Sequence, residues 1–340
     1  MSGSQYAAAG VDLAGGDAAK RRIAALVQGA RTPHSVGKVG AFGGMVRVPE
    51  GYRRPVLVMS TDGVGTKVMV AREAGRYDTV GEDLVNHSVN DILVHGARPL
   101  AFLDYVAGAG LGIEETAAIV EGVARGCRNH DMALAGGETA QMPGLYRPGE
   151  FDLAGTIVGV VEEDAAIHGD AIVPGDVLIA LESTGLHTNG YTLARAILFD
   201  RLKLALDAVI PGTEGTLGQV LLAVHRSYLA ALMPVLDRVH GLAHITGGGI
   251  PGNLARILPS GCEAVVDAAS WTLPPLFELL QRGGEVSQDE MLDVFNLGVG
   301  MIVVAPADQA DPVRSAATAA GVPSWMLGEI RSGATGVRLV

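Results

Sequence analysis

Short apolar runs that suit β-strands alternate with amphipathic stretches that suit helices along the whole of this 340-residue chain. A chain that alternates in this way favours an α/β or α+β fold. In the first half we expect strands at residues 56–59, 100–106, 132–135 and 153–161, and helices at residues 17–29, 79–95 and 114–129.

The alternation restarts after a polar, turn-rich passage at residues 162–175, which begins with three successive carboxylates and ends in Pro174 and Gly175. Such a passage between two apolar strands is typical of a domain boundary, and 340 residues suit two domains of about 150 residues each. We therefore expect domains at residues 1–165 and 170–340. In the second domain we expect strands at residues 177–181, 262–267 and 299–304, and helices at residues 191–198, 217–239, 276–281 and 311–320.

Composition excludes several kinds of partner. The net charge is −12 and only 4% of the residues are aromatic, so we expect no nucleic-acid binding. No apolar run approaches the ~20 residues that span a bilayer, and the first residues lack the basic and apolar regions of a secretory signal. Cys127 and Cys262 stand alone, which excludes a thiolate zinc site. We expect a cytoplasmic protein that does not bind membranes.

The segment 61–67 reads Thr-Asp-Gly-Val-Gly-Thr-Lys and follows an apolar strand. Glycines there let backbone N–H groups approach phosphate oxygens, Lys67 adds a positive charge, and Asp62 is a ligand type that Mg²⁺ prefers. The spacing is not that of a Walker A motif, and a plain β-turn with a surface lysine remains an alternative. The glycine-rich segment 37–44 is either a nucleotide-covering loop or a tight hairpin.

Further carboxylates lie on the predicted helix 79–95 and in a glycine-rich turn. Asp83, His87 and Asp91 form one stripe of the helix, without the basic partners of an ordinary ion-pair ladder. Glu138 lies in the turn at residues 135–139. These groups suit a cation or a Mg²⁺-nucleotide, or else a solvated helix face and a structural turn.

In the second half, two strand–glycine–helix segments offer polar groups. Residues 183–190 contain His187, which is either a general acid or base or a helix cap, together with Thr188 and Asn189. Residues 244–253 contain three consecutive glycines, which favour close approach of the backbone to an anion. The pattern alone predicts a two-domain Mg²⁺-nucleotide enzyme and leaves its reaction open.

Taken together, these segments resemble the phosphoribosylformylglycinamidine cyclo-ligase family, the aminoimidazole ribonucleotide synthetases of de novo purine biosynthesis. The resemblance runs nearly end to end and includes the motifs at residues 9–12, 42–44, 60–67, 89–99, 102–105, 136–144, 185–191, 244–249 and 295–301. Each glycine turn is a weak signal, but their order and spacing together are specific.

The resemblance implies an ATP-dependent ring closure of formylglycinamidine ribonucleotide that releases ADP and phosphate, with Mg²⁺ and often K⁺. It implies a PurM-like fold in which an N-terminal ATP-binding domain forms a dimeric sheet or barrel and a C-terminal α/β domain binds substrate. A homodimer is therefore expected. The family reaction phosphorylates the formyl amide oxygen, so that a poor leaving group becomes a good one before the amidine nitrogen attacks.

Matching positions carry the family roles onto this chain. Catalytic roles fall to His187, Asp62 and Lys67, and metal ligation to Asp62, Asp91 and Glu138. Substrate binding falls to His187, Thr188, Asn189, Thr246, Gly247, Gly248 and Gly249. Nucleotide binding falls to Phe42, Gly43, Gly44, Asp62, Gly63, Gly65, Thr66, Lys67, Asn90, Asp91, Gly137, Glu138 and Thr139.

The chain also departs from the family pattern. A Thr-Arg pair common in the second domain is His225-Arg226 here, and His87 replaces an apolar residue of several relatives. Sister enzymes are less compatible. Selenophosphate synthetase needs an N-terminal reactive cysteine and the carbamoyl dehydratase a terminal one, and the large amidine-forming synthetase is much longer. Thiamine-phosphate kinase and a non-catalytic nucleotide binder remain as alternatives.

Overall fold

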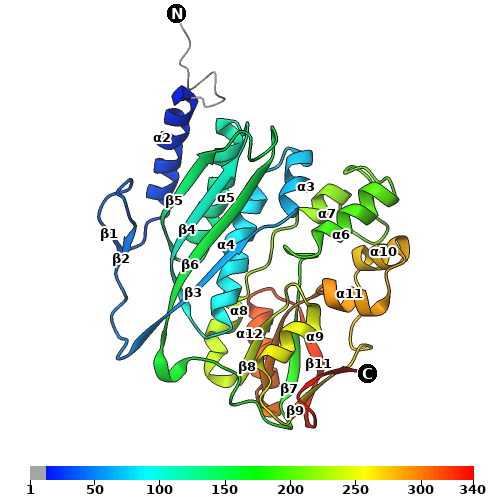
Figure 1. The fold of residues 1–340 in the computed structure, drawn as a ribbon. Coiled ribbons are helices and arrows are strands. Elements are labelled where there is room, and N and C mark those ends of the chain that lie inside the picture. The colour runs from blue at the N-terminus through cyan, green and yellow to red at the C-terminus, as the bar shows by residue number, and fades with distance from the viewer. Residues whose placement is uncertain (1–12) are drawn as a thin grey trace, which may run out of the picture. The chain divides into compact units, whose positions relative to one another are not determined.

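The computed structural model describes residues 13–340, so the motif at residues 9–12 lies outside the described residues. The chain forms two compact units (Figure 1). The first contains the described residues up to Val89 together with Arg98–Val160. The second contains Asn90–Ala97 and Val161–Val340. The division passes through a single helix, α4 (Asp78–Leu93), whose last turn belongs to the second unit.

The first unit is built on a four-stranded sheet with the strand order β3-β6-β4-β5. The central pair, β4 and β6, is antiparallel, whereas β4 and β5 are parallel. A short hairpin precedes the sheet. The strands of this unit are β1 (Ser35–Val36), β2 (Met45–Val46), β3 (Pro55–Gly63), β4 (Arg98–Gly108), β5 (Ala133–Gln141) and β6 (Phe151–Glu162).

Helices α4 and α5 (Ile113–Asn129) cover one face of this sheet (Figure 1). Glycines let the two helices approach closely, since a Cβ on Gly81 would lie 2.1 Å from the Ile119 carbonyl oxygen and one on Gly122 2.0 Å from that of Asp78. Gly155 of β6 similarly leaves room for Phe102 and Leu84. Two further helices are α2 (Leu13–Gly29) and α3 (Lys67–Ala74).

The opposite face of the sheet, which we call the outer face, exposes large apolar side chains. Thr61 and Thr156 contact each other across β3 and β6, which places both residues on this face. Because side chains alternate along a strand, Leu57 and Met59 share the face with Thr61, and Leu103 and Tyr105 share it with Thr156. All four of these apolar side chains are exposed.

The second unit is built on a six-stranded sheet with the order β12-β9-β11-β7-β10-β8, in which only β12 and β9 are parallel. Its strands are β7 (Val177–Glu182), β8 (Gly241–His244), β9 (Cys262–Val266), β10 (Val299–Ala305), β11 (Ser324–Ser332) and β12 (Gly336–Leu339). Alternation along β7 and β10 sends Ile179 and Met301 into one core and Leu178 and Ile302 into the other.

Helices cover both faces of this sheet. One core includes residues of α8 and α12 together with Leu93 from the last turn of α4, and the other includes residues of α9. The helices are α6 (Tyr191–Arg195), α7 (Leu217–Leu221), α8 (Leu229–Leu232), α9 (Gly249–Leu254), α10 (Pro275–Gly284), α11 (Gln288–Val294) and α12 (Ala310–Ala319), with a π-helical segment at Ala196–Arg201 and short 3₁₀ turns at Glu163–Ala165, Met233–Arg238, Ala255–Ile257 and Ala307–Gln309.

The structure corrects two expected elements. Residues 135–139 were expected to form a glycine-rich turn but lie within β5. The predicted helix 217–239 is interrupted between α7 and α8, and His225 lies in the non-helical part. No helix in the described part of the chain is long and apolar enough to cross a membrane.

Candidate functional site

In the first unit, Asp62 lies where β3 turns toward α3. Gly65 takes a left-handed backbone conformation (φ 66°), which lets the chain reverse before the helix begins at Lys67. The Ser60 hydroxyl donates to Asp62 Oδ2 at 2.7 Å, and His87 Nε2 lies 3.5 Å from Oδ1. The Asp62 side chain keeps 24% of its surface exposed. The carboxylate is therefore both oriented and accessible, as a Mg²⁺ ligand must be.

Lys67 does not occupy the position that the sequence predicted. Its side chain is completely buried, and Nζ lies 2.8 Å from Oδ2 of Asp83, which is also buried. Burial lowers the pKa of Lys67 because it removes the ammonium group from water, while Asp83 opposes that effect. An ammonium group enclosed in this way presents no charge to a phosphate at the surface. The structure thus places Lys67 in a buried ion pair, and its phosphate contact stays a prediction.

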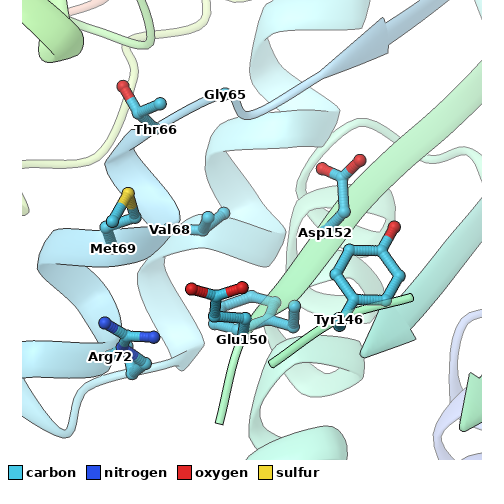
Figure 2. Close-up of a pocket in the computed structure, with 9 residues that line it drawn as sticks. Gly65, Thr66, Val68, Met69, Arg72, Tyr146, Glu150 and Asp152 are labelled. Atoms are coloured by element: carbon cyan, nitrogen blue, oxygen red, sulfur yellow. The ribbon is translucent and has the colours of Figure 1, made fainter. Parts of the chain in front are cut away.

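A cavity of about 360 Å³ lies beside α3 and the turn that precedes it (Figure 2). Gly65 and Thr66 line it at the turn. Arg72, in the second turn of α3, adds a positive charge to its wall. Apolar, aromatic and acidic side chains complete its wall. The other lining residues are Val68, Met69, Tyr146, Glu150, Phe151 and Asp152. The sequence analysis missed these residues because they are contributed by separate segments.

On β5, Gly137 and Glu138 point to opposite faces of the sheet. A Cβ on Gly137 would lie 2.2 Å from Asp104 Oδ1, so glycine is required for Asp104 to fit. Glu138 pairs with Tyr105 on the outer face, whereas Asp62 is on the opposite face, where it contacts His87. The predicted convergence of Asp62 and Glu138 on one ion within a single chain is therefore not supported by the structure. Thr139 adjoins Glu138 and donates its N–H to Glu138 Oε1.

The segment 37–44 forms the bend between β1 and β2. A Cβ on Gly44 would lie 2.4 Å from the Ala135 carbonyl oxygen, so Gly44 packs directly on the β5 edge. Phe42 is fully exposed, and a Cβ on Gly43 would meet nothing within 4 Å. The strand order separates this segment at the β5 edge from Asp62 on β3. The structure thus divides the predicted nucleotide-binding residues of the first unit between two edges of one sheet.

In the second unit, Asn90 is completely buried and serves as an anchor. Its Oδ1 accepts from the Tyr228 N–H at 2.9 Å, and its Nδ2 donates to the Arg226 carbonyl oxygen at 2.9 Å. Direct nucleotide contact was predicted for Asn90; in this structure its amide is buried and bonded to the backbone. The next residue, Asp91, remains partly exposed, and its Oδ1 lies 2.6 Å from His244 Nδ1.

The segment 183–190 presents His187 in a constrained conformation. His187 has a positive φ of 59°, which is uncommon for a residue other than glycine and indicates that the surrounding contacts impose it. The Thr184 N–H donates to His187 Nε2 at 3.1 Å. The imidazole is buried and stacks on His225, with ring centroids 3.9 Å apart. Thr188 also contacts His225, since its Oγ1 lies 3.3 Å from His225 Nδ1.

The structure brings two predicted substrate segments together. A Cβ built on Gly247 would lie 3.5 Å from Asn189 Oδ1, so residues 187–189 adjoin residues 246–249. Asn189 Nδ2 is buried and has no hydrogen-bond acceptor among the described residues. Asn253 braces the glycine segment because its Nδ2 bonds the carbonyl oxygens of Thr246, Gly247 and Gly249. A buried donor beside a braced glycine loop is suited to an anionic ligand.

The sequence analysis missed three buried residues of this region, His225, Tyr228 and Asn253, and did not single out His244 within its segment. His225 was noted only as a departure from the family pattern, and the predicted helix concealed its position in a loop. A Cβ on Gly300 would lie 1.8 Å from the Tyr228 hydroxyl oxygen and 2.7 Å from His187 Cε1. Position 300 on β10 must therefore be glycine, and this need is visible only once the chain is folded.

Comparison with known proteins agrees with this architecture. A family model described as "AIR synthase related protein, N-terminal domain" matches residues 43–161, and its C-terminal counterpart matches residues 173–340. A phosphoribosylformylglycinamidine cyclo-ligase of Myxococcus xanthus is 48% identical over 97% of both chains. One of Trichlorobacter lovleyi is 46% identical, over 96% of this chain and 95% of its own.

Among solved structures, the hydrogenase maturation protein HypE in complex with ATP shares the fold, with a TM-score of 0.62 and 20% identity over 94% of this chain and 90% of that one. The chain thus belongs to the AIR synthase related proteins, with the two-domain PurM-like fold expected from the sequence. Within that class it belongs to the phosphoribosylformylglycinamidine cyclo-ligase family, the ATP-dependent cyclising ligases of purine biosynthesis.

Proposed function

We propose that this chain closes the imidazole ring of aminoimidazole ribonucleotide from formylglycinamidine ribonucleotide, with ATP converted to ADP and phosphate. The observation that carries the proposal is the similarity to curated cyclo-ligases over nearly the whole of both chains. An ATP complex of a protein with the same fold supports the use of ATP.

The chemical problem is that an amide oxygen is a poor leaving group. Transfer of the γ-phosphoryl group to the formyl amide oxygen creates an imidate phosphate ester. The amidine nitrogen then attacks the imidate carbon, the C–O bond breaks and inorganic phosphate leaves. The protein must align the two substrates and exclude water while charge develops on the phosphoryl oxygens.

In the first unit, Asp62 is the residue that we propose to hold Mg²⁺. A single carboxylate with a neighbouring hydroxyl suits this ion, which is commonly bound by one or two carboxylates and substrate phosphates. When bound, the ion neutralises phosphate charge during transfer. Ser60 and His87 keep the carboxylate of Asp62 oriented toward that role. Backbone N–H groups of the turn at Gly63, Gly65 and Thr66 would face the phosphates.

In the second unit, the adjoining segments at residues 187–189 and 246–249 are proposed to bind the ribonucleotide. Asn189 Nδ2 supplies a buried donor without an acceptor of its own among the described residues. His187 lies next to it and is proposed to face the reacting amide. Its constrained backbone fixes the imidazole direction, as a positioned acid or base requires. Asp91, which remains partly exposed, is proposed as a metal-facing carboxylate.

We also propose a homodimer in which two outer faces meet, because these faces expose the apolar side chains of β3 and β4. Glu138 lies on the outer face at the β5 edge, with Thr139 next to it in the strand, and Gly44 packs on that edge beside Gly43. A second copy on this face would cover part of the predicted nucleotide-binding set. A cytoplasmic location accords with purine biosynthesis.

The test is to incubate purified protein with Mg²⁺-ATP, K⁺ and formylglycinamidine ribonucleotide, and to follow ADP together with the diazo derivative of the aminoimidazole. We expect stoichiometric formation of both. Asp62→Asn should lower kcat by about 100-fold or more through lost charge stabilisation, while the exposed Asp170→Asn should leave it unchanged. Omission of K⁺ from a parallel assay measures its contribution.

The alternative functions give different results in this assay. ADP release without aminoimidazole would indicate a sister kinase, and ATP binding without phosphate release would indicate a binding protein. Normal turnover by folded Asp62→Asn would remove that residue from the proposed site.

A further inference from the structure

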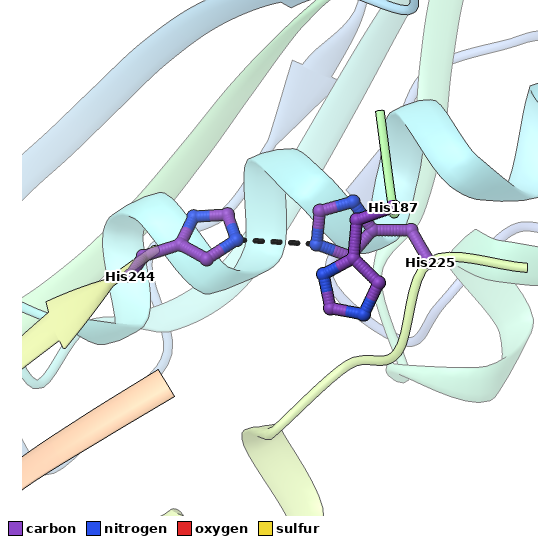
Figure 3. A group of neighbouring side chains, drawn as sticks. All are labelled: His187, His225 and His244. Carbon is purple, nitrogen blue, oxygen red and sulfur yellow. Dashed lines mark hydrogen bonds between the residues drawn. The ribbon is translucent and has the colours of Figure 1, made fainter. Parts of the chain in front are cut away.

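Two histidine rings lie face to face inside the second unit (Figure 3). His187 follows β7, and His225 comes from the loop between α7 and α8. Their ring centroids are 3.9 Å apart and their planes are inclined by 21°. Both imidazoles are buried. One face of His187 is therefore covered by a flat ring that a distant segment of the chain supplies.

The His225 ring is itself held at both of its nitrogens. Nδ1 lies 3.3 Å from Thr188 Oγ1. Nε2 lies 3.1 Å from His244 Nε2, the contact drawn in Figure 3, and 3.2 Å from Asn90 Nδ2. Polar partners on two edges of a ring fix its plane as well as its position. His225 is thus a firm surface for the ring stacked on it.

Other contacts confine His187 away from the stacked face. A Cβ on Gly300 would lie 2.7 Å from His187 Cε1, so β10 passes close to the edge of the ring. The Tyr228 ring is inclined to it by 52°, with centroids 6.3 Å apart. The Thr184 hydroxyl donates to the Val224 carbonyl oxygen at 2.6 Å, which ties together the two segments that carry the stacked rings. The imidazole therefore has little freedom to turn.

The backbone beside His187 determines which ring nitrogen carries the proton. The Thr184 N–H donates to His187 Nε2 at 3.1 Å, so Nε2 supplies its lone pair to this bond. A neutral imidazole has one N–H, which is then on Nδ1. A ligand group that contacts Nδ1 meets a hydrogen-bond donor. The lone pair that a general base needs is already used by Thr184.

We propose that His225 is a positioning residue whose ring holds His187 as a neutral hydrogen-bond donor, with the proton on Nδ1. The inference rests on the proposed function, in which His187 faces the reacting amide. A fixed donor there stabilises negative charge that develops on an amide or phosphoryl oxygen, without giving up its proton. The sequence left open whether His187 is an acid or a base, and this arrangement excludes the base.

The first test is spectroscopic and needs no turnover. Long-range ¹H–¹⁵N correlation spectra of the full-length protein with labelled histidines report the tautomer of each ring, and His187→Gln identifies the His187 signals by their loss. We expect a pyrrole-type Nδ1, a pyridine-type Nε2, and ring protons shifted upfield by the stacked ring. His225→Asn should abolish the upfield shift, whereas His225→Phe, which keeps a flat ring, should preserve it.

The second test is kinetic. His225→Asn should lower kcat by about 10- to 100-fold with little change in the KM for the ribonucleotide, because a misplaced group costs rate more than binding. His225→Phe should restore most of the lost rate. In a His187→Gln background, His225→Asn should add almost nothing, since the two residues act as a unit. His168→Gln, at an exposed histidine outside the cluster, should behave as the unchanged protein does.

A His187 ring with its proton on Nε2 would overturn the proposal, as would equal kcat values for His225→Asn and the unchanged protein. An equal loss of rate in both backgrounds would also contradict it. If His225→Asn fails to fold, the tautomer in the unchanged protein and the kcat of His225→Phe decide. If the unchanged protein forms no aminoimidazole, the proposed function fails, while the spectra still decide the tautomer and the stack.

Discussion

At the scale of single residues, burial determines the behaviour of Asp104. Its carboxyl group faces the covered side of the first unit's sheet against Gly137, and burial raises its pKa to about 7, with a smaller opposing effect from a backbone hydrogen bond. The folded protein therefore binds this proton more tightly than the unfolded chain. The contribution of Asp104 to the free energy of unfolding is therefore fully present below pH 4. It is lost as the pH rises through about 7.

Asp104→Asn should remove this pH dependence. The raised pKa corresponds to a cost of up to about 4 kcal/mol above pH 7, since each unit is about 1.4 kcal/mol. Urea unfolding at pH 5 and pH 8 should show a gain for the variant that grows with pH. The exposed Asp131→Asn should show no such growth. A gain that is equal at both pH values would contradict the assigned pKa.

Residue identity could be predicted from the sequence better than residue environment. The sequence marked Asp62, and the structure places it where a ligand can reach it. It also marked Lys67, Asn90 and Glu138, but the first two are buried and paired and the third lies on the outer face. The burial of a side chain and the face it occupies depend on strand alternation and on pairing with distant residues. A local sequence motif carries no information about either.

At the scale of elements, the glycine segment before α9 has two different requirements. Gly249 has φ 56°, and a Cβ there would lie 1.7 Å from the Leu292 carbonyl oxygen. Gly247 has no such restriction, because its Cβ would meet only Asn189 Oδ1 at 3.5 Å. One glycine is therefore needed for the fold, and the other borders the proposed substrate.

Gly249→Ala should destabilise the protein by about 2–5 kcal/mol, from the left-handed backbone and the clash together. Gly247→Ala should change stability by less than about 0.5 kcal/mol yet raise the KM for the ribonucleotide through the crowding of Asn189. Thermal unfolding and steady-state kinetics measure the two effects. Equal melting temperatures for both variants would refute the assignment.

Most elements of both units could be predicted from periodicity, including the helix at residues 114–129 and the buried strand at 299–304, which the structure places at Ile113–Asn129 and Val299–Ala305. Periodicity failed at residues 135–139, where glycines pair within a strand, and at the break that contains His225. In both places tertiary contacts override local preference.

At the scale of the whole molecule, the outer face of the first unit supplies a test of assembly. Met59→Glu places a charge among the exposed apolar side chains of β3 and should shift the protein toward a monomer, because burial of that charge would be costly. Light scattering during size-exclusion chromatography gives the mass. Arg331→Glu, at an exposed position in the second unit, should leave the mass unchanged. A monomeric unchanged protein would exclude the proposed dimer.

The order of the chain has a consequence for any attempt to dissect it. The backbone leaves the first unit within α4, returns at Arg98 and leaves again after Val160. A fragment that starts at the boundary expected from composition would lack the octapeptide 90–97. It would lose Asn90, which pins the His225 loop, and Leu93, which fills one core. The second half is thus not an autonomous genetic module, and a working split would have to graft that octapeptide onto the second fragment.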